Sequence, residues 1–438
     1  MKGVEAALAI WEESRRGMFL SQALRNYSTD LSEGERRLAS TLVYSAMRRY
    51  SLWVDIIKSF LHRPFESLFP LTGDALILGC AGLLEIKHFF PQALVNAFVE
   101  AVKKKRPNDV GLVNAVLRRV LADGGRRIEE LKSSQNLLDQ ALLWGLPPWV
   151  ARRWAETWGQ ELAKKLFVSQ VVKPYLSFRL SPDISAEEMV SRLLKVGIRS
   201  WPSPYFSYVL RSASFGLPPS IVGYDEGLWT PQTESSVFIS EQAVLLSAGK
   251  RLILDMCAGR GIKTGHILER TQNTIVEAWD ISKNKVNAGR RELKRLSVLE
   301  RSIWKAGDSL SLVPDAIPDL VLLDAPCSGS GTWNRHPEGK WKLSSGKLAG
   351  YSRLQKDLLK RAIDLLASGG IVVYSTCSMF REENEMVVGE VLCSAPEVIE
   401  IEIDGKSFPL QRGRPFGYYI WPSSPWMDGF FLCILMKR

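Results

Sequence analysis

The amino-acid sequence predicts a multidomain protein with an all-α bundle, a small α+β module and a doubly wound α/β domain. Helical apolar periodicity fills residues 4–140, and mixed patterns follow it. From residue 250 onward, short apolar runs alternate with amphipathic helices. These changes divide the chain into three expected parts, residues 1–140, 141–245 and 246–438. A chain of 438 residues is long enough to form several separate cores.

The first part is predicted to be a bundle of helices. Its clearest helix covers residues 33–61, where apolar side chains recur at spacings of three and four: Leu38, Leu42, Val43, Met47 and Tyr50. Ser32, with Glu35 three residues later, predicts a capping box at the start of this helix. Further periodic stretches, separated by Pro, Gly and Asn, complete the bundle.

The second part is predicted to be a small α+β module that follows a tryptophan-rich helix. Paired prolines in WGLPPWVARRWAETWG stand where such a helix would begin. The strand-like KPYLSFRLSPD, the helix-like SAEEMVSRLLKVG and the aromatic WPSPYFSYVL come next. We therefore expect a mixed module between the bundle and the third part.

The third part is predicted to contain a largely parallel sheet. Four apolar runs, RLILDMCAG, NTIVEAWDIS, PDLVLLDAPCSG and GGIVVYSTCS, alternate with amphipathic helices, which is typical of buried parallel strands. The tail GYYIWPSSPWMDGFFLCILMKR is predicted to form two strands joined by a turn. These two strands would add an antiparallel edge to the sheet.

Charge favours a polyanionic partner. The net charge is +10 and the sequence pI is about 9.2, and positive side chains release counterions when they neutralise phosphates. Nucleic acid is the natural candidate, although a merely basic, solvated surface has the same composition.

Cysteine and histidine usage predicts reduced thiols and no metal site. The six cysteines form no CxxC pair, and the four histidines are scattered rather than grouped at zinc-ligand spacing.

The amino terminus lacks a signal-peptide pattern, and the longest apolar run, ALILGCAGLLEI, is too short to span a bilayer. We expect a cytoplasmic protein that does not contact membranes.

The residues after the first two apolar runs predict a nucleoside cofactor, because ligands bind at the carboxyl ends of parallel strands. Gly259 and Gly261 lie in a small-residue loop that opens a helix, and Asp280 ends the next run, where an acid can bridge ribose hydroxyls. Thr264 stands in place of the third glycine of a dinucleotide fingerprint, and no Walker frame precedes it. S-adenosyl-L-methionine is the remaining common ligand, and Asp308 is a further acid that can meet its adenine.

Cys327 and Cys377 each follow an apolar run, so both are expected at this ligand-binding edge. A free cysteine is often a simple core residue, so either one alone is weak support for chemistry. Two thiols beside a methyl donor indicate covalent catalysis at carbon 5 of a pyrimidine, in which one thiolate adds to carbon 6 and the other assists release. Lys263 is expected to favour the thiolate, and Asp324 to hydrogen-bond cytosine. A helix cap is the alternative for Asp324.

The segments DAPCSGSGTWNRHPEGKW and YSTCSMFREENE resemble the paired cysteine motifs of the Sun/Nop-type RNA (cytosine-5) methyltransferases. The resemblance implies that Cys377 is the nucleophile and that Cys327 helps to release the methylated RNA. It also implies a Rossmann-like class I methyltransferase domain. The residues that it places at S-adenosylmethionine are Cys257, Ala258, Gly259, Arg260, Gly261, Ile262, Lys263, Asp280, Asp308 and Asp324.

The resemblance extends over nearly the whole chain. WTPQTESSVF and DGFFLCILMKR are similar to segments that flank the family's catalytic domain, and ERRLASTLVYSAMRR and VGLVNAVLRR resemble the NusB-type RNA-binding module. This combination is typical of the branch that methylates small-subunit (16S) rRNA. It implies an rRNA partner, RNA binding by the helical bundle and the α+β module, and no obligate protein partner.

The cofactor loop departs from the family pattern Cys-Ala-Ala-Pro-Gly-Gly-Lys, because Arg260 replaces the proline and one glycine has moved to Gly259. We expect Gly259 to restore the flexibility lost at Ile262, so that the cofactor still binds. The alternatives are the same chemistry on tRNA, an RNA-binding protein with an inactive methyltransferase fold, and a DNA methyltransferase. The last leaves Cys377 without a role.

Overall fold

The computed structural model describes residues 2–27, 29–87, 90–213, 221–403 and 408–438. Contacts between residues divide the chain into two units. The first unit consists of Met1–Val172 with Trp333–Lys342, and the second of Lys173–Thr332 with Leu343–Arg438. No helix in the described ranges is both long and apolar enough to cross a membrane.

The first unit is helical in its described residues, as the sequence predicts. Its helices are α1 (Lys2–Arg15), α2 (Leu20–Tyr27), α3 (Glu33–Arg48), α4 (Tyr50–Lys58), α5 (Pro70–Glu85), α6 (Pro91–Lys103), α7 (Val110–Ser133), α8 (Leu137–Leu143), α9 (Pro148–Ser169) and α14 (Glu338–Lys342), with 3-10 turns η1 (Phe65–Ser67) and η2 (Pro107–Asp109). The predicted capping box at Ser32 and Glu35 is present.

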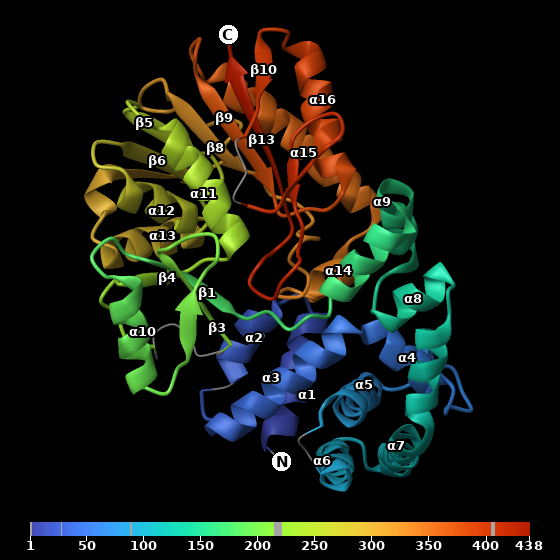
Figure 1. Ribbon diagram of the computed structural model, residues 1–438. Helices are drawn as coiled ribbons and strands as arrows, with labels where there is room; N and C mark the ends of the chain where they lie inside the picture. The colour runs from blue at the N-terminus through green and yellow to red at the C-terminus, as the bar shows by residue number, and fades with distance from the viewer. Residues whose placement is uncertain (1, 28, 88–89, 214–220, 404–407) are drawn as a thin grey trace. The chain divides into compact units, whose positions relative to one another are not determined.

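Helix α5 is the centre of this unit and contacts α1, α3, α4, α6 and α7 (Figure 1). Its run ALILGC is apolar on every side, as expected for a helix enclosed by its neighbours. At Gly79 a Cβ atom would lie 2.7 Å from a Leu117 side-chain carbon, so the missing side chain lets α7 approach closely. The apolar run that is too short for a membrane is therefore the core helix of the bundle.

The helix predicted over residues 33–61 is instead broken at Arg49 into α3 and α4. The backbone at Arg49 has φ −126° and ψ 34°, outside the helical range. Gly145 lies so close to the break that a Cβ atom there would be 2.4 Å from the Arg48 carbonyl oxygen. No Pro or Gly marks the break within MRRYS, so only contacts from distant parts of the chain explain it.

The segment Trp333–Lys342 fills part of the helical unit, although it is distant in sequence. Trp341 Nε1 donates to the Met47 carbonyl at 2.7 Å, and Lys340 Nζ donates to the Arg48 carbonyl at 2.5 Å. These bonds satisfy carbonyl groups that the end of α3 leaves without helical partners. The buried Glu338 carboxylate accepts the Leu20 N–H at 3.2 Å, at the start of α2.

This division differs from the three parts expected from the sequence. The helical unit does not end near residue 140 but continues through α8 and α9 to Val172. Leu143 belongs to the apolar core of the bundle, and Trp154 of α9 stacks on Trp333 at 5.8 Å between ring centroids. The tryptophan-rich helix therefore belongs with the first unit rather than with the α+β module.

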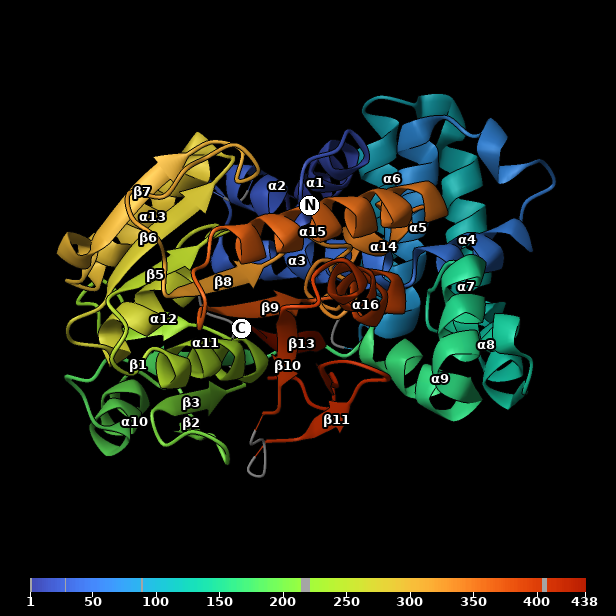
Figure 2. The same ribbon diagram turned by 90° about the horizontal axis from the view of Figure 1, so that it is seen from above.

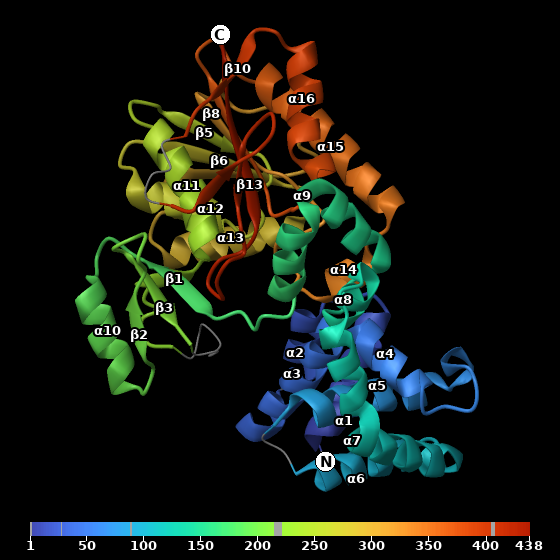
Figure 3. The same ribbon diagram turned by 45° about the vertical axis from the view of Figure 1, so that its right-hand side comes forward.

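The second unit begins with the predicted α+β module. Among the described residues, its strands form an antiparallel sheet in the order β2-β3-β1-β4. Figure 3 shows α10 beside this sheet. The elements are β1 (Leu176–Leu180), α10 (Ala186–Lys195), β2 (Ser200–Pro202), β3 (Val209–Ser212) and β4 (Trp229–Pro231).

The larger sheet of the second unit has nine strands within the described residues, in the order β11-β12-β13-β9-β8-β5-β6-β7, with β10 also paired to β13. The elements are α11 (Glu234–Leu246), β5 (Leu252–Asp255), α12 (Ile262–Arg270), β6 (Ile275–Asp280), α13 (Lys283–Arg295), η4 (Leu299–Arg301), β7 (Ser302–Ala306), β8 (Leu320–Asp324), α15 (Ser345–Asp364), β9 (Ile371–Thr376), η5 (Arg381–Glu383), α16 (Glu385–Ser394), β10 (Val398–Ile401), β11 (Leu410–Arg412), β12 (Tyr418–Ile420) and β13 (Phe430–Lys437).

This sheet confirms the predicted doubly wound fold. Strands β7, β6, β5, β8 and β9 are parallel, and β13 pairs antiparallel to β9. Helices α11 and α12 cover one face and α15 covers the other (Figure 2). From β5 the chain continues outward through β6 to β7, and then crosses back to β8 on the other side of β5. The carboxyl end of β5 therefore marks the topological switch point, where ligands bind in such folds.

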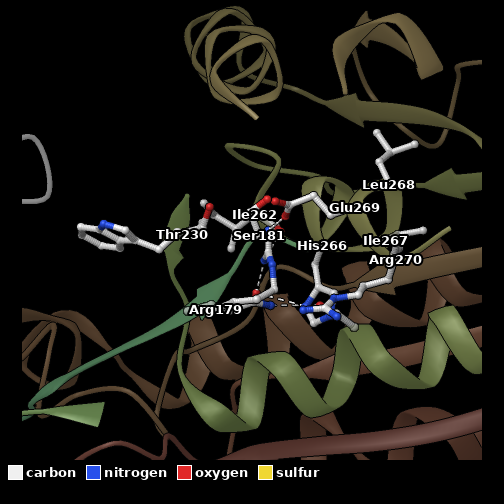
Figure 4. A network of polar contacts seen from close by, with 12 residues as sticks. Arg179, Ser181, Thr230, Ile262, His266, Ile267, Leu268, Glu269 and Arg270 are labelled. Carbon is white, nitrogen blue, oxygen red and sulfur yellow. Dashed lines mark hydrogen bonds and ion pairs between the residues drawn. The ribbon is translucent and has the colours of Figure 1, made fainter. Parts of the chain in front are cut away.

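A buried polar network joins the small sheet to α12 within the second unit. Figure 4 shows Arg179 of β1 reaching Ile262 and Glu269, at the two ends of α12. Arg179 pairs with Glu269, and both side chains are almost fully buried, while Arg179 Nη1 lies 3.5 Å from the Ile262 carbonyl oxygen. Arg270 Nη2 donates to the Leu180 carbonyl at 3.2 Å. The module is thereby fixed to the helix that follows the cofactor loop.

Replacing Glu269 by alanine should lower the free energy of unfolding of the second unit by about 3–5 kcal/mol, because the buried Arg179 charge loses its partner. Denaturant titration with hydrogen exchange of the α12 amides measures this loss. Glu188→Ala is the matched control, since it removes the exposed partner of Arg192 and should cost no more than about 0.5 kcal/mol. Equal losses in the two variants would mean that burial gives the Arg179 pair no special importance.

Candidate active site at the carboxyl edge of the sheet

The two cysteine loops meet at the carboxyl ends of neighbouring parallel strands. In the register of β8 and β9, Asp324 lies opposite Ser375, so the loops that follow start side by side. The Sγ atoms of Cys327 and Cys377 are 3.3 Å apart, and both residues are half-buried. The Gly331 N–H donates to the Cys377 carbonyl at 2.9 Å, which ties the two loops together. The structure therefore places both sulfur atoms at one point.

Asp324 and Lys263 form an ion pair beside these loops. Lys263 Nζ lies 2.5 Å from Asp324 Oδ2, and the Ser375 hydroxyl donates to Asp324 Oδ1 at 2.8 Å. The helix-cap alternative for Asp324 is wrong, because α14 begins only at Glu338. Burial works against the Lys263 charge, but the Asp324 carboxylate outweighs it and raises the pKa of Lys263. Lys263 therefore remains a cation at the carboxyl edge of the sheet.

The thiols of Cys327 and Cys257 keep their protons. The hydrogen bond with Cys377, together with burial, raises the pKa of Cys327 well above its ordinary value. Burial beside Asp255, Asp324 and Asp280 raises the pKa of Cys257. In the Cys327–Cys377 contact, either sulfur atom can act as the hydrogen-bond donor.

The cofactor loop, residues 257–263, connects β5 to α12 at the switch point. Gly259 and Gly261 have φ +60° and +76°, in the left-handed region that favours glycine. No atom lies within 4 Å of the position that a Cβ atom on Gly259 would take. The Ala258 N–H donates to the Trp279 carbonyl at 2.8 Å, and Arg260 is exposed. Gly259, which departs from the family pattern, therefore occupies a position whose backbone conformation favours glycine.

The structure brings two of the predicted acids to this loop. Asp280 is buried at the end of β6, where Oδ2 accepts the Gly259 N–H at 3.1 Å and Oδ1 accepts the Ser282 N–H at 2.8 Å. Asp308 is exposed, just beyond Gly307, whose N–H donates to the Asp280 carbonyl at 3.1 Å. The Asp280 carboxylate therefore holds the loop through the Gly259 N–H, and it also lies at the carboxyl edge of the sheet, where ligands bind in such folds.

Sequence reasoning missed two side chains that organise the cysteine loops. Ser375 holds the Asp324 carboxylate, and the buried Glu383 accepts hydrogen bonds from the residues that follow both cysteines. The only signal for Glu383 was the acidic run REENE after the second cysteine, which alone is typical of a solvated surface.

Two family models match separate parts of the chain. The model described as 16S rRNA methyltransferase RsmB/F matches residues 243–436, and the model described as the NusB family matches residues 4–122. The first range contains the parallel sheet and both cysteines, and the second lies within the helical unit. The NusB-like and Rossmann-like parts predicted from the sequence are thereby confirmed.

Whole-chain relatives agree with these matches. The chain is 31% identical over 437 residues to ribosomal RNA small subunit methyltransferase B of Thermus thermophilus, covering 98% of this chain and 96% of that protein. It is 28% identical over 437 residues to the protein of the same name from Klebsiella pneumoniae, covering 99% of this chain and 97% of that protein.

A solved structure shares the fold along the entire chain. The crystal structure of PH0851 matches with a TM-score of 0.82 at 22% identity, covering 100% of this chain and 98% of that one. The parallel sheet with two thiols at its carboxyl edge, the helical unit and the relatives that match along the whole length all lead to one conclusion. The chain belongs to the RsmB/F family of 16S rRNA methyltransferases.

Proposed function

We propose that the protein methylates carbon 5 of a cytosine in small-subunit rRNA, using S-adenosyl-L-methionine and a covalent bond between Cys377 and carbon 6. The observation that carries this proposal is the 3.3 Å separation of the Cys327 and Cys377 sulfur atoms, next to the Asp324–Lys263 pair. A single thiol at a strand end is common, but two thiols from adjacent strands match a reaction that needs both attack and release.

The residues at the switch point fit a nucleoside methyl donor. Gly259 leaves open space above the loop, Asp280 offers carboxylate oxygens at the end of β6, and α12 presents the N–H groups of its first turn. Residues 257–263, with Asp280, Asp308 and Asp324, would hold the cofactor. When bound, S-adenosylmethionine supplies an electrophilic methyl group.

The chemistry assigned to Cys377 is nucleophilic addition. Its thiolate would form a bond to carbon 6, and the electron pair of the C5–C6 double bond would move to carbon 5. Carbon 5 would then be the nucleophile that takes the methyl group as the sulfonium S–CH3 bond breaks and the donor leaves as a neutral thioether. Loss of the carbon 5 proton to a base then restores the double bond and expels the Cys377 thiolate. The Lys263 cation and the Cys327 thiol both lie in the part of the site where Cys377 would react.

Asp324 and Cys327 have supporting roles in this proposal. The Asp324 carboxylate, held by Lys263 and Ser375, can accept a hydrogen bond from the exocyclic amine of cytosine. Cys327 lies close enough to the attacking sulfur to assist its departure from carbon 6. These roles require Asp324 to meet the amine edge of the base and Cys327 to remain beside the Cys377 sulfur.

The rRNA substrate is proposed from family membership and from charge. The relatives are named ribosomal RNA small subunit methyltransferase B, and the net charge of +10 suits a polyanion. An unpaired cytosine is the expected target, because extruding such a base costs the least free energy. The NusB-like unit would add affinity for the RNA.

Covalent attack can be tested with cysteine variants incubated with S-adenosylmethionine and unassembled small-subunit rRNA. A protein–RNA adduct should accumulate in Cys327→Ala and be absent in Cys377→Ala, as seen on a denaturing gel. The reverse pattern would exchange the two roles. Methylation of tRNA but not of this rRNA by the wild type would contradict the substrate.

Cofactor binding can be tested by calorimetry with S-adenosylmethionine. Asp280→Ala should weaken binding by roughly 10- to 100-fold, because charge-assisted hydrogen bonds to the ligand and to the Gly259 loop are lost together. Asp315→Ala is the control, since it removes an exposed carboxylate that pairs with Lys305. No binding to the wild-type protein would support the inactive-fold alternative instead.

Asp255 should make the stability of the second unit depend on pH. Burial at the end of β5 raises its pKa to about 7, so the folded state holds a proton that the unfolded state releases near 3.8. The stability contributed by this proton is complete below the unfolded pKa and is lost as the pH rises through the folded pKa. From about pH 5 to about pH 8, wild-type stability should fall ~3 kcal/mol more than that of Asp255→Asn. Denaturant unfolding of both proteins measures the difference, and parallel pH profiles would contradict the assignment.

A further inference from the structure

Glu383 is a fully buried carboxylate close to the candidate active site. It ends the 3-10 turn η5, six residues after Cys377, and its side chain is 0% exposed. Burial raises its pKa, while hydrogen bonds from Ser328 and Ser378 oppose that effect. Burying a carboxylate costs free energy unless hydrogen bonds compensate for the lost water. The donors around Glu383 provide this compensation.

The Glu383 carboxylate bridges the residues that directly follow the two cysteines. The Ser328 N–H donates to Oε1 at 2.8 Å, and the Ser328 hydroxyl donates to Oε2 at 2.5 Å. The Ser378 hydroxyl donates to the same Oε2 atom. One side chain therefore holds the position after Cys327 and the position after Cys377 together.

The bridge is itself held from two further elements. Gln355 of α15 donates to Glu383 Oε1 at 3.1 Å and to the Pro326 carbonyl at 2.9 Å. The Tyr374 hydroxyl of β9 donates to the Glu383 carbonyl oxygen at 2.6 Å. Four donated hydrogen bonds thus converge on the carboxylate, which is itself fixed to the sheet and to α15.

We propose that Glu383 is a positioning residue that sets the relative placement of the Cys327 and Cys377 thiols. The importance of that placement rests on the proposed function, in which both sulfur atoms serve one pyrimidine ring. A displacement of about 1 Å in a reacting group can cost roughly 100-fold in rate, so a shared support for both loops has a chemical consequence. A carboxylate that only stabilised the fold would not need to contact both serines.

The first test measures thiol proximity without RNA or cofactor. Oxidised glutathione is added to the full-length protein; one thiolate forms a mixed disulfide, and the second thiol displaces glutathione to give a Cys327–Cys377 disulfide. Two electrons pass to the glutathione disulfide, which leaves as two thiols. Peptide mass spectrometry then gives the ratio of the protein disulfide to the mixed disulfide at Cys327 and Cys377.

Glu383→Ala should lower this ratio by about tenfold or more, because the second thiol no longer stands near the first. Glu383→Gln keeps one acceptor oxygen and should give an intermediate ratio. Glu390→Ala removes an exposed carboxylate of α16 and should leave the ratio unchanged. The exposed Cys393 serves as an internal reference for modification by glutathione. An unchanged ratio in Glu383→Ala would overturn the proposal.

Ser328→Ala and Ser378→Ala decide the question if Glu383→Ala does not fold. Each removes one arm of the bridge, so each should lower the ratio. Adding Glu383→Gln to either should produce less than the sum of the separate effects, because the residues act as one unit. Unchanged ratios in both serine variants would overturn the proposal.

The second test uses the reaction. With rRNA and S-adenosylmethionine, Glu383→Gln should retain covalent adduct several-fold longer than the wild type, while Glu390→Ala should not. An altered disulfide ratio with an unaltered adduct lifetime would reduce Glu383 to a structural role and overturn the proposal. Failure of the proposed function has a different signature: no adduct even in Cys327→Ala, with the disulfide ratio still dependent on Glu383.

Discussion

The register of β8 against β9 is the constraint on which the candidate site depends. Parallel pairing places Asp324 opposite Ser375, so the two loops leave the sheet at the same level. A slip of one residue would turn the side chains of one strand to the other face of the sheet and separate the two cysteines. The buried apolar runs LVLLD and IVVYST fix this register, because both strands lie inside the sheet. Apolar packing thus determines where the two sulfur atoms meet.

Buried ion pairs give the small sheet a defined place within the second unit. Arg179 pairs with Glu269 of α12, and Arg211 of β3 makes a two-pronged contact with the buried Glu234 of α11 at 2.6 Å. Such pairs add little stability relative to apolar contacts of the same size, but a wrong arrangement leaves a charge buried alone. We infer that their main effect is specificity. The module is attached to the helices next to the cofactor loop in one orientation.

Much of this architecture could be predicted from local patterns. Four of the five parallel strands, the helical bundle and the capping box at Ser32 follow from apolar spacing and from turn chemistry. The pairing of the two cysteine loops follows from the rule that parallel strands end at one edge. The break at Arg49 could not be predicted, because the helical pattern continues through it and the contacts that cause it come from Gly145 and from residues 333–342.

The same limit applies to Glu383, since its partner Ser328 is 55 residues away and local sequence gives no sign of their pairing. The helical part was expected to end near residue 140, but the first unit extends to Val172, for a related reason. Trp154 can be placed with the bundle only once its partner Trp333 is known. Long-range contacts, rather than local propensity, decide these features.

The discontinuous helical unit has a consequence for the order in which the protein matures on the ribosome. Residues up to Val172 emerge first, but Trp333–Lys342 are made about 160 residues later, which is a delay of roughly 8 to 30 s at ordinary rates of synthesis. Until then, the Met47 and Arg48 carbonyls and the Leu20 N–H lack the partners that the finished chain provides. The unit that is translated first is therefore completed only after the strand leading to Cys327 has been synthesised.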